Sequence, residues 1–558
     1  MKRAVQAPTS AASAPRWRRL HVCIFAFALP LGAQAPGSPG SPWSPGSLAA
    51  DRARLAEITG DTTLLRPAQD PRVATLFPWL PLAQRIDLAV VRPEVRVTWN
   101  SDLPYSLNDG AMWAGRGWNT SVSAGLSLRE SYRGAQVDLR VAPALTYSEN
   151  LPFQIIPYPN ADYPNRDRST YANPLHPPIA SIDMPMRFGD AYLLRLDPGR
   201  TALTVRYRGA SAGIATDNEW WGPGIRNALI MSNNAPGVPR MFIGTATPLH
   251  TRAGLVEARL LAGQLTQSRF FSEASTENRT LSALLATLRP AFDTNVTFGL
   301  ARSVYTPIGQ YNSEFTAMIA HAADAFWRWE QIAPPGAVDA NGNPQQRSDQ
   351  VASLFFRWVF PTAGFELYGE WARMDLPISA MEMLVSPTNS GGYTMGFQYA
   401  RPRAHGSYLR LQGELTNLEQ TLVFPNRPPP DFYTGRASPQ GYTQRGQVIG
   451  AGIGPGASSQ WVATDWLARR WQAGAFVGRI RWENDALYRQ VAPTFFRHDV
   501  SILSGVRGGW RSAVSDFTAE LTVARRLNYL FQNGFANPGG YRDVDVQNIT
   551  LALVATPR

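Results

Sequence analysis

Hydrophobic and polar residues alternate along many short segments of this chain. From residue 351 to 360, for example, Leu354, Phe356 and Trp358 occupy one face of an extended segment, and Ser353 and Arg357 occupy the other. A period of two residues predicts a β-strand, because successive side chains of a strand point to opposite faces. The same pattern recurs in segments that begin at residues 136, 203, 256, 365, 409, 476 and 517.

The predicted strands are spread from about Val95 to Val554, and helical periodicity is scarce. A soluble antiparallel sandwich also alternates, because one face of each sheet meets water and the other meets a core. Strands of about ten residues, with Trp and Phe on the apolar face near the strand ends, favour an outer-membrane barrel. We therefore expect an all-β fold, an antiparallel transmembrane β-barrel over residues 93–558, with a closing strand from Val546 to Val554.

The polar faces of these strands carry both signs of charge. A mixed lining indicates a cross-braced, closed interior rather than an open pore, although some porins also use arginine ladders. In the predicted lumen Arg206, Arg208, Arg259, Arg357, Arg410, Arg479 and Arg481 face Glu257, Glu366, Glu370, Glu414 and Glu520.

Four long segments between the predicted strands are rich in Pro, Gly, Asn, Tyr or Arg. Outer-membrane barrels have short turns at one rim and long loops at the other. We therefore expect these segments to face outward or to fold into the lumen. They are residues 151–186, 331–348, 423–442 and 533–543.

Residues 1–35 have the organisation of a secretory signal peptide. A basic region precedes an apolar run over residues 22–31, and small residues allow cleavage after Ala33 or Ala35. The only cysteine, Cys23, lies in this leader, so the mature protein would have no disulfide. Loss of the leader would lower the formal charge from +11 to +6, because residues 1–35 hold five basic residues and no acid.

Residues 36–46 repeat Pro, Gly and Ser, which predicts a flexible linker. The next segment, residues 47–92, begins with Ser47 as a helix cap. We expect a helix from Leu48 to Thr59, with Leu55 and Ile58 on one face and Gly60 as its end. After the leader no run of 18 or more apolar residues occurs, which excludes helical membrane spans.

The sequence offers no metal or cofactor site. Its six histidines are far apart and none has HExxH spacing, so we expect no metal and no cofactor. Lys2 is the only lysine, which excludes a P-loop in the mature chain. Nucleic-acid binding is not expected, because the arginines face acids along the strands and form no basic stripe.

Two patterns raise the question of catalysis. Gly209 to Gly213 matches GxSxG around Ser211, but no helical stripe follows, and small residues at a strand bend explain it better. Asp217 and Glu219 would place two carboxylates roughly 6–7 Å apart on one strand face, between the two spacings that glycosidases use. Catalytic pairs normally come from different elements, so we expect that the protein is not an enzyme.

The segment from residue 217 to 234 combines a Trp pair, Gly-Pro-Gly and an Asn pair. Flat indole faces with an N–H donor suit stacking on sugar rings, but a membrane-belt position is equally consistent. Pro223 followed by Gly224 matches the preference of a type II turn. The candidate polysaccharide-binding residues are Asp217, Glu219, Trp220, Trp221, Arg226, Asn233 and Asn234.

Three blocks of the chain resemble the Wzi family of outer-membrane capsule-assembly proteins. They are residues 217–234, residues 349–371 with Arg357-Trp358 and the Gly364-to-Trp371 strand, and residues 440–456 with Gly-Tyr-Thr and Gly-Pro-Gly. The blocks occur in order, and the resemblance extends from about Leu48 to the C-terminus. The resemblance does not identify individual sugar-binding residues.

The resemblance implies a monomeric barrel of about 18 strands, occluded by loops, with a small N-terminal helical periplasmic module. It implies a lectin in the outer membrane that binds capsular polysaccharide or exopolysaccharide and promotes its attachment and assembly at the cell surface. Outer-membrane lipid would be the other partner. The alternative is a substrate-specific outer-membrane porin, and an outer-membrane esterase or glycosidase is less favoured.

Overall fold

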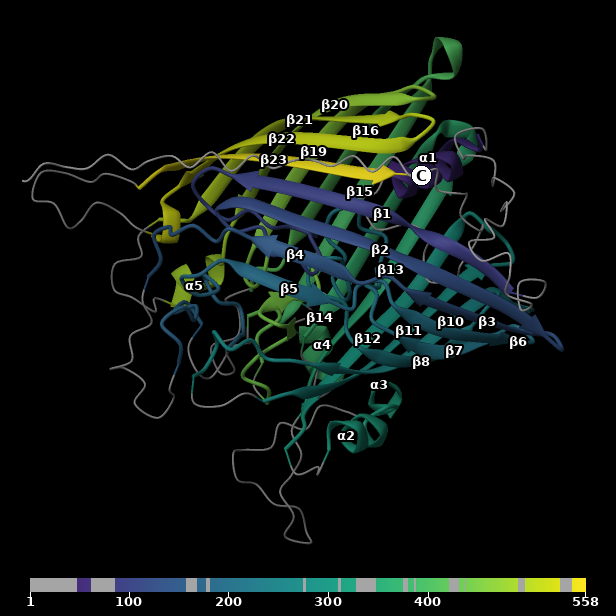
Figure 1. Ribbon diagram of the computed structural model, residues 1–558, viewed down its shortest axis with the longest axis horizontal. Helices are drawn as coiled ribbons and strands as arrows, with labels where there is room; N and C mark the ends of the chain where they lie inside the picture. The colour runs from purple at the N-terminus through teal and green to yellow at the C-terminus, as the bar shows by residue number, and fades with distance from the viewer. Residues whose placement is uncertain are drawn as a thin grey trace, which may run out of the picture. The chain divides into compact units, whose positions relative to one another are not determined.

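The structure is a computed structural model in which the chain divides into residues 1–31 and 32–558. The expected signal peptide, the 36–46 linker, and the loop segments 331–347 and 533–543 lie outside the described residues. Described are residues 48–61, 86–156, 168–176, 181–273, 277–309, 313–327, 348–374, 380–385, 388–420, 431–435, 437–489, 497–531 and 544–557 (Figure 1).

Most of the described residues belong to one large antiparallel sheet, as the alternation of side chains predicts. Its strands are β1 (Ile86–Asn100), β2 (Gly117–Tyr132), β3 (Ala135–Val141), β4 (Ala144–Ser148), β5 (Leu193–Asp197), β6 (Ala202–Tyr207), β7 (Ala210–Ala215), β8 (Arg240–Thr245), β9 (Leu249–Thr251), β10 (Gly254–Leu265), β11 (Arg279–Pro290), β12 (Val296–Pro307), β13 (Asp349–Phe360), β14 (Phe365–Arg373), β15 (Gly391–Pro402), β16 (Tyr408–Asn417), β19 (Ser458–Leu467), β20 (Trp471–Arg481), β21 (Val500–Arg511), β22 (Ser515–Leu527) and β23 (Val546–Pro557).

Short elements lie outside this sheet, in the connections and at the N-terminal end of the described chain. The two-residue strands β17 (Thr443–Gln444) and β18 (Gln447–Val448) pair with each other. The helices are α1 (Leu48–Thr59), α2 (Glu314–Ala320), α3 (Asp324–Trp327), α4 (Ala380–Val385) and α5 (Asn484–Arg489), and the 3₁₀ turns are η4 (Pro361–Ala363), η5 (Ala404–Gly406) and η6 (Tyr529–Phe531).

The sheet closes on itself. β1 pairs with β2 on one side and with β23 on the other, from Val95 opposite Ala555 to Asn100 opposite Thr550. Three pairs of consecutive strands each share one position in the ring: β3 with β4, β5 with β6, and β8 with β9. The 21 described strands of the sheet therefore occupy 18 positions, which confirms the predicted antiparallel β-barrel and its closing strand.

The two ends of the barrel differ in the length of their connections. Eight short turns join neighbouring strands at one end, here called the turn end, and nine longer connections join the described strands at the other, the loop end. α1 and α5 lie at opposite ends in Figure 1. The turns are residues 133–134, 208–209, 252–253, 291–295, 361–364, 403–407, 468–470 and 512–514.

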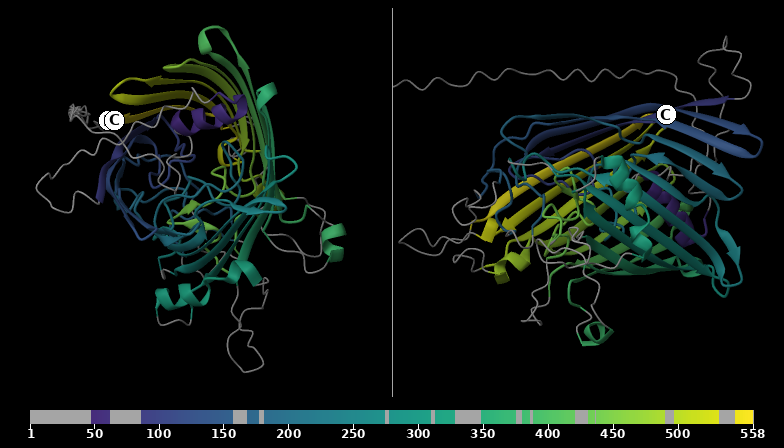
Figure 2. Two further views of the ribbon diagram at one scale, coloured as in Figure 1. Left: turned by 90° about the vertical axis from the view of Figure 1, so that its right-hand side faces the viewer. Right: turned by 90° about the horizontal axis from the view of Figure 1, so that it is seen from below.

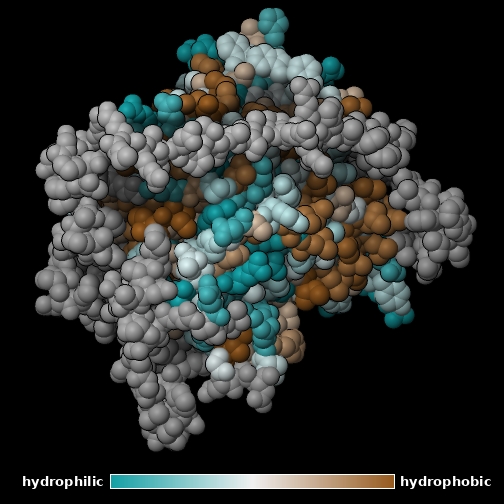
Figure 3. Space-filling view, turned by 60° about the vertical axis from the view of Figure 1, so that its left-hand side comes forward, coloured by the Kyte–Doolittle hydropathy of each residue, from teal (hydrophilic) through white to brown (hydrophobic). Residues whose placement is uncertain are grey.

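The outer face of the wall is apolar, with aromatic residues near both ends. Leu126, Leu354, Val477 and Val506 are exposed on this face, and Figure 3 shows several patches of hydrophobic side chains on the face of the molecule that it draws. Such a band between two aromatic girdles is typical of a barrel embedded in a bilayer. Exposed rings near the turn end are Tyr132, Tyr207, Trp358, Tyr399, Trp466, Trp471 and Trp510, and those near the loop end are Trp118, Tyr147, Tyr192 and Tyr393.

No helix among the described residues is long and apolar enough to cross a membrane. The helix expected from Leu48 to Thr59 is α1, and Gly60 ends it with a positive φ of 67°. Leu55 and Ile58 are fully buried, and they pack with the inward residues Val359 and Ala400 near the turn end. α1 therefore lies against the inner wall of the barrel at this end, whereas the expected cap Ser47 lies outside the described residues.

The lumen is filled by two of the long connections. Residues 216–239, here the inner loop, and residues 431–457 of the β16–β19 connection form a buried apolar cluster with inward side chains of the wall. The left view of Figure 2 shows the ring of strands around these segments. Leu229, Ile230, Ile449 and Ile453 are members of this cluster, and each is at most 4% exposed.

The predicted lining of the lumen is wrong at three arginines. Along β20, Phe476 and Ile480 are buried in the interior cluster and Val477 is exposed, so Arg479 and Arg481 belong to the outer face. The filled lumen offers apolar contacts, and therefore the apolar face of a strand need not point to lipid. Arg208 lies in the exposed β6–β7 turn, where a positive φ of 48° ends the alternation.

Candidate functional site

The inner loop enters the lumen because the strands that carry it are short. β7 and β8 have six residues each, so the chain leaves the wall well below the loop end and crosses the interior before it returns. Asn218 ties the two arms of the loop together by donating to the carbonyl of Ala235 at 2.7 Å. Trp221 and Met231 form an antiparallel bridge between the same arms. The segment that the sequence singled out is thus the core of a plug.

Asp217 and Glu219 attach the start of the inner loop to the wall. Arg240 on β8 binds both carboxylates at 2.7 Å. Arg140 on β3 binds Asp217 at 2.7 Å, and Arg259 on β10 binds Glu219 at 2.8 Å. Partly buried pairs of this kind, with hydrogen bonds to several partners, hold an element in one position. The two carboxylates lie in the chain just after β7 rather than on a strand, and arginine side chains surround them.

The two tryptophans have different environments. Trp221 is 1% exposed, packs in the interior cluster, and donates its indole N–H to Glu219 at 3.2 Å. Trp220 is only partly buried and donates to the carbonyl of Gly224 at 3.1 Å. The burial of Trp221 leaves no ring face for a ligand in this conformation.

The expected type II turn at Pro223 and Gly224 is wrong. Such a turn needs a positive φ at Gly224, but the positive φ, 116°, belongs to Gly222. A Cβ on Gly222 would lie 2.5 Å from the Glu370 carboxylate, and a Cβ on Gly224 would lie 2.3 Å from the carbonyl oxygen of Asn227. Both glycines are therefore explained by close packing of the loop, and Gly222 also by its left-handed backbone.

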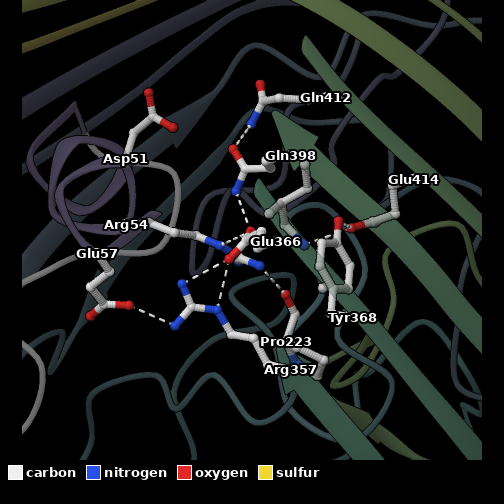
Figure 4. A network of polar contacts seen from close by, with 12 residues as sticks. Asp51, Arg54, Glu57, Pro223, Arg357, Glu366, Tyr368, Gln398, Gln412 and Glu414 are labelled. Atoms are coloured by element: carbon white, nitrogen blue, oxygen red, sulfur yellow. Dashed lines mark hydrogen bonds and ion pairs between the residues drawn. The ribbon is translucent and has the colours of Figure 1, made fainter. Parts of the chain in front are cut away.

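Glu414 on β16 holds the tip of the inner loop. Its carboxylate accepts the backbone N–H groups of Ile225, Arg226 and Asn227 at 2.6, 3.2 and 2.9 Å. The hydroxyl of Tyr368 donates to the same carboxylate at 2.9 Å, and Figure 4 shows the two side chains facing each other. A carboxylate that accepts several N–H groups replaces the hydrogen bonds that a crossing loop loses to water.

The plug and α1 meet in one polar network (Figure 4). Arg54 on α1 binds Glu366 on β14 at 2.7 Å and donates to the carbonyl of Pro223 at 2.8 Å. Glu366 also binds Arg357 at 2.8 Å and accepts from Gln398 at 2.6 Å. Arg54 therefore joins the helix at the turn end to the loop that fills the lumen.

The remaining expected residues lie on the plug as well. Arg226 stacks its guanidinium carbon 4.8 Å from the ring centroid of Trp461 on the inner wall. Asn233 donates to the carbonyl of Asn108 at 3.1 Å, and Asn234 donates to that of Val448 at 2.9 Å. Asp217 and Glu219 border one small cavity of about 20 Å³, and Arg226 borders another. Asn234 borders a much larger cavity at the loop end.

This loop-end cavity has a volume of about 210 Å³. Segments that are far apart in the sequence line it: the connections β1–β2, β4–β5, β7–β8, β16–β19, β20–β21 and β22–β23, and the end of β22. A mixture of ring faces and convergent polar groups is typical of sites that bind small polar molecules such as sugars. Its aromatic lining is Tyr105, Trp113, Phe153, Trp482, Tyr529 and Phe531, and its polar lining is Asn173, Asn234, Gln447, Glu483, Asp499 and Arg526.

Arg526 organises one side of the cavity. Its guanidinium forms two bonds of 2.7 Å with Asp499 and lies 5.1 and 4.7 Å from the ring centroids of Trp482 and Tyr529. Burial raises the pKa of Asp499, and the Arg526 charge limits that rise. Burial also raises the pKa of Tyr529 to about 12, so its hydroxyl stays protonated and donates to the carbonyl of Gln154 at 2.6 Å. These groups form a fixed aromatic and polar wall.

His176 lies behind the other side of the cavity. Its Nδ1 is 3.4 Å from Asp431 and its Nε2 is 3.6 Å from Glu483, whose carboxylate also accepts from Asn173 at 2.8 Å. Burial by itself lowers the pKa of a histidine, but Asp431 and Glu483 raise the pKa of His176 above its ordinary value. Protonation of the imidazole would therefore favour its contacts with Asp431 and Glu483, which belong to two other loop-end segments around the cavity.

The cavity residues were not among those expected from the sequence, apart from Asn234. Their positions are separated by up to several hundred residues, and only closure of the barrel brings them together. The sequence does contain one local signal for the cavity, the dipeptide Trp482-Glu483 at the end of β20. It places an aromatic residue beside a carboxylate, as Glu219-Trp220 does.

The described residues contain no group of three or more metal-ligating side chains. Ser211 lies within β7 and donates to the carbonyl of Gly244 at 3.3 Å, so the GxSxG pattern forms a strand rather than a strand-turn-helix elbow.

A family model described as "Capsule assembly protein Wzi" matches residues 114–477, about two thirds of the chain. No curated protein matches. Among solved structures, the Escherichia coli outer-membrane protein Wzi, described as involved in group 1 capsule assembly and as a carbohydrate-binding β-barrel, is similar with a TM-score of 0.50 and 12% identity over 86% of each chain. OccAB2 of Acinetobacter baumannii has a TM-score of 0.41 and 7% identity over 85% of this chain and 98% of its own.

Proposed function

The chain belongs to the Wzi family of capsule assembly proteins, and from this premise we propose that it is an outer-membrane lectin without catalytic activity. It binds capsular polysaccharide or exopolysaccharide in the loop-end cavity and promotes attachment of the polymer at the cell surface. The loop end faces outward, because long connections of outer-membrane barrels are extracellular and short turns are periplasmic. Residues 1–35 are removed on export, 36–46 is the linker, and the protein acts as a monomer.

One observation carries this proposal: a cavity lined by rings and polar groups lies above a filled lumen. Its volume of about 210 Å³ is below the roughly 300 Å³ at which pockets for drug-sized ligands begin. The cavity is therefore suited to one sugar unit of a polymer whose neighbouring units extend over the loops. Ring faces of Trp113 and Trp482 would stack on the sugar, and Asn173, Asn234 and Glu483 would bond its hydroxyls.

Of the seven residues expected to contact polysaccharide, we retain Asn234 as a direct contact. Asp217, Glu219, Trp220, Trp221, Arg226 and Asn233 are proposed to act by fixing the inner loop beneath the cavity. A porin is disfavoured, because apolar side chains of the inner loop and of the wall pack against each other across the lumen.

The cellular experiment compares attached and released polymer in the bacterium that makes this protein. Removal of the gene should lower cell-bound polysaccharide and raise polysaccharide in the medium. The wild-type gene and a Trp466→Ala control, which changes an exposed ring on the outer wall, should restore attachment, whereas a Trp482→Ala/Glu483→Gln double variant should not. Unchanged attached and released pools after gene removal would refute the attachment function.

A further inference from the structure

The turn end of the barrel is rimmed by arginine. The eight turns contain six arginines and one acidic residue, Asp293. The Asp293 carboxylate accepts hydrogen bonds from Asn295 and Trp358. One further arginine, Arg401, stands at the end of β15. The seven, here the arginine rim, are Arg133, Arg208, Arg252, Arg401, Arg403, Arg469 and Arg470.

All seven side chains of the arginine rim are exposed. Among the described residues none of them takes part in an ion pair. Other arginines at this end do have such partners: Arg357 binds Glu57 and Glu366, and Arg289 lies 3.8 Å from Glu257. Within the part of the chain that the structure describes, the rim therefore presents guanidinium charge that no acidic side chain compensates.

The rim is placed against the lipid-facing side of the barrel rather than its lumen. Arg133 lies over the ring of Tyr132 at 5.2 Å, and Arg208 lies over Tyr207 at 5.1 Å. Both tyrosines are exposed on the outer face, as is Trp471, which follows Arg470. The same arrangement of an outward ring with an arginine just beyond it thus recurs on separate strands.

Aromatic rings at a barrel end mark the interface between hydrocarbon and headgroups. A guanidinium one residue beyond such a ring lies at the depth of the headgroup phosphates. Its planar fork binds phosphate oxygens with two hydrogen bonds, which an ammonium cannot reproduce. The mouth of the lumen at this end is meanwhile occupied by α1, so a polymer inside the barrel would not reach the rim.

We propose that the arginine rim is a binding surface for the phosphate groups of anionic glycerophospholipids in the leaflet around the turn end. This surface fixes the depth and orientation of the barrel and is independent of the polysaccharide cavity, which lies at the opposite end.

The experiment measures binding of phosphatidylglycerol to the purified full-length protein by native mass spectrometry, with phosphatidylcholine as the neutral probe. The fourfold variant Arg401→Gln/Arg403→Gln/Arg469→Gln/Arg470→Gln should bind phosphatidylglycerol at least about tenfold more weakly, and phosphatidylcholine should bind as before. The matched control is Arg525→Gln, an exposed arginine at the loop end, and it should leave phosphatidylglycerol binding unchanged. Folding is checked by the heat-dependent gel shift typical of barrels.

If the fourfold variant fails to fold, the two double variants at 401/403 and 469/470 are measured separately, and each should lose part of the affinity. Lysine at the same four positions should recover only part of the binding. Equal phosphatidylglycerol affinity of folded wild type and glutamine variants would overturn the proposal. It would also be overturned if the glutamine variants kept lipid binding and lost binding of the host's own polysaccharide.

Discussion

Neighbouring residues of the inner loop carry out different tasks although their types are the same. Trp221 is buried in the interior cluster and Trp220 is only partly buried. Removal of the buried Trp221 ring would leave a large cavity in the core, which is costly. The two tryptophans therefore separate a packing role from a surface role.

Trp221→Ala should lower the free energy of unfolding by about 3–5 kcal/mol, because it removes a fully buried ring. Trp220→Ala, the matched control, should lower it by about 1–2 kcal/mol. Denaturant titration of both variants in the same detergent measures the difference. An equal loss for the two variants would contradict the distinct environments.

Glu414→Gln tests the anchor of the inner loop. The carboxylate accepts three backbone N–H groups, and an amide places a donor where one acceptor is needed, so stability should fall by about 1–3 kcal/mol. Protease sensitivity of the inner loop should rise in parallel. Glu257→Gln, which changes an exposed carboxylate, is the control and should alter neither.

At the level of elements, the strands and α1 could be predicted from local patterns. Alternation is a property of neighbouring residues, so it located the strands and the closing strand. It did not decide which face of β20 points inward, because Phe476 and Ile480 find apolar partners in the plug. The need for glycine at position 222 was also hidden, since part of it comes from the approach of Glu370 on a distant strand.

The cavity could not be predicted for a related reason. Asn173 and Glu483 belong to different loop-end connections and Arg526 to the end of β22, and no sequence spacing relates them. The candidate residues around the Trp pair, in contrast, formed a compact motif that turned out to pack the plug beneath the cavity. A local cluster of aromatic and charged residues thus indicated the loop that fills the lumen, and the contact of this loop with a ligand stays a prediction.

The connections around His176 should loosen as the pH rises. Its raised pKa means that the folded state favours the protonated imidazole, so the contribution to stability is complete below the ordinary pKa of about 6.5 and is lost as pH rises through the folded pKa. After correction for base-catalysed intrinsic exchange, the protection of the backbone amides in residues 168–176 should therefore fall from pH 6 to pH 9. His176→Gln should remove this pH dependence, and a persisting dependence would assign it to another group.

At the scale of the whole molecule, the filled lumen should prevent ions and solutes from passing through the barrel. The inner loop, residues 431–457 and α1 pack inside the described wall, and Arg54 joins the helix to the loop. Purified protein in planar bilayers should therefore show no steady conductance. A stable, ion-selective channel would favour the porin alternative and contradict the plug.

The most direct measurement of the central claim is equilibrium binding of the host's own polysaccharide to the purified protein. The wild type should bind saturably, and the Trp482→Ala/Glu483→Gln variant should bind about tenfold more weakly, a loss of about 1.4 kcal/mol, while the Trp466→Ala control should match the wild type. Absence of binding by the wild type, or equal affinity of the folded double variant, would contradict the account.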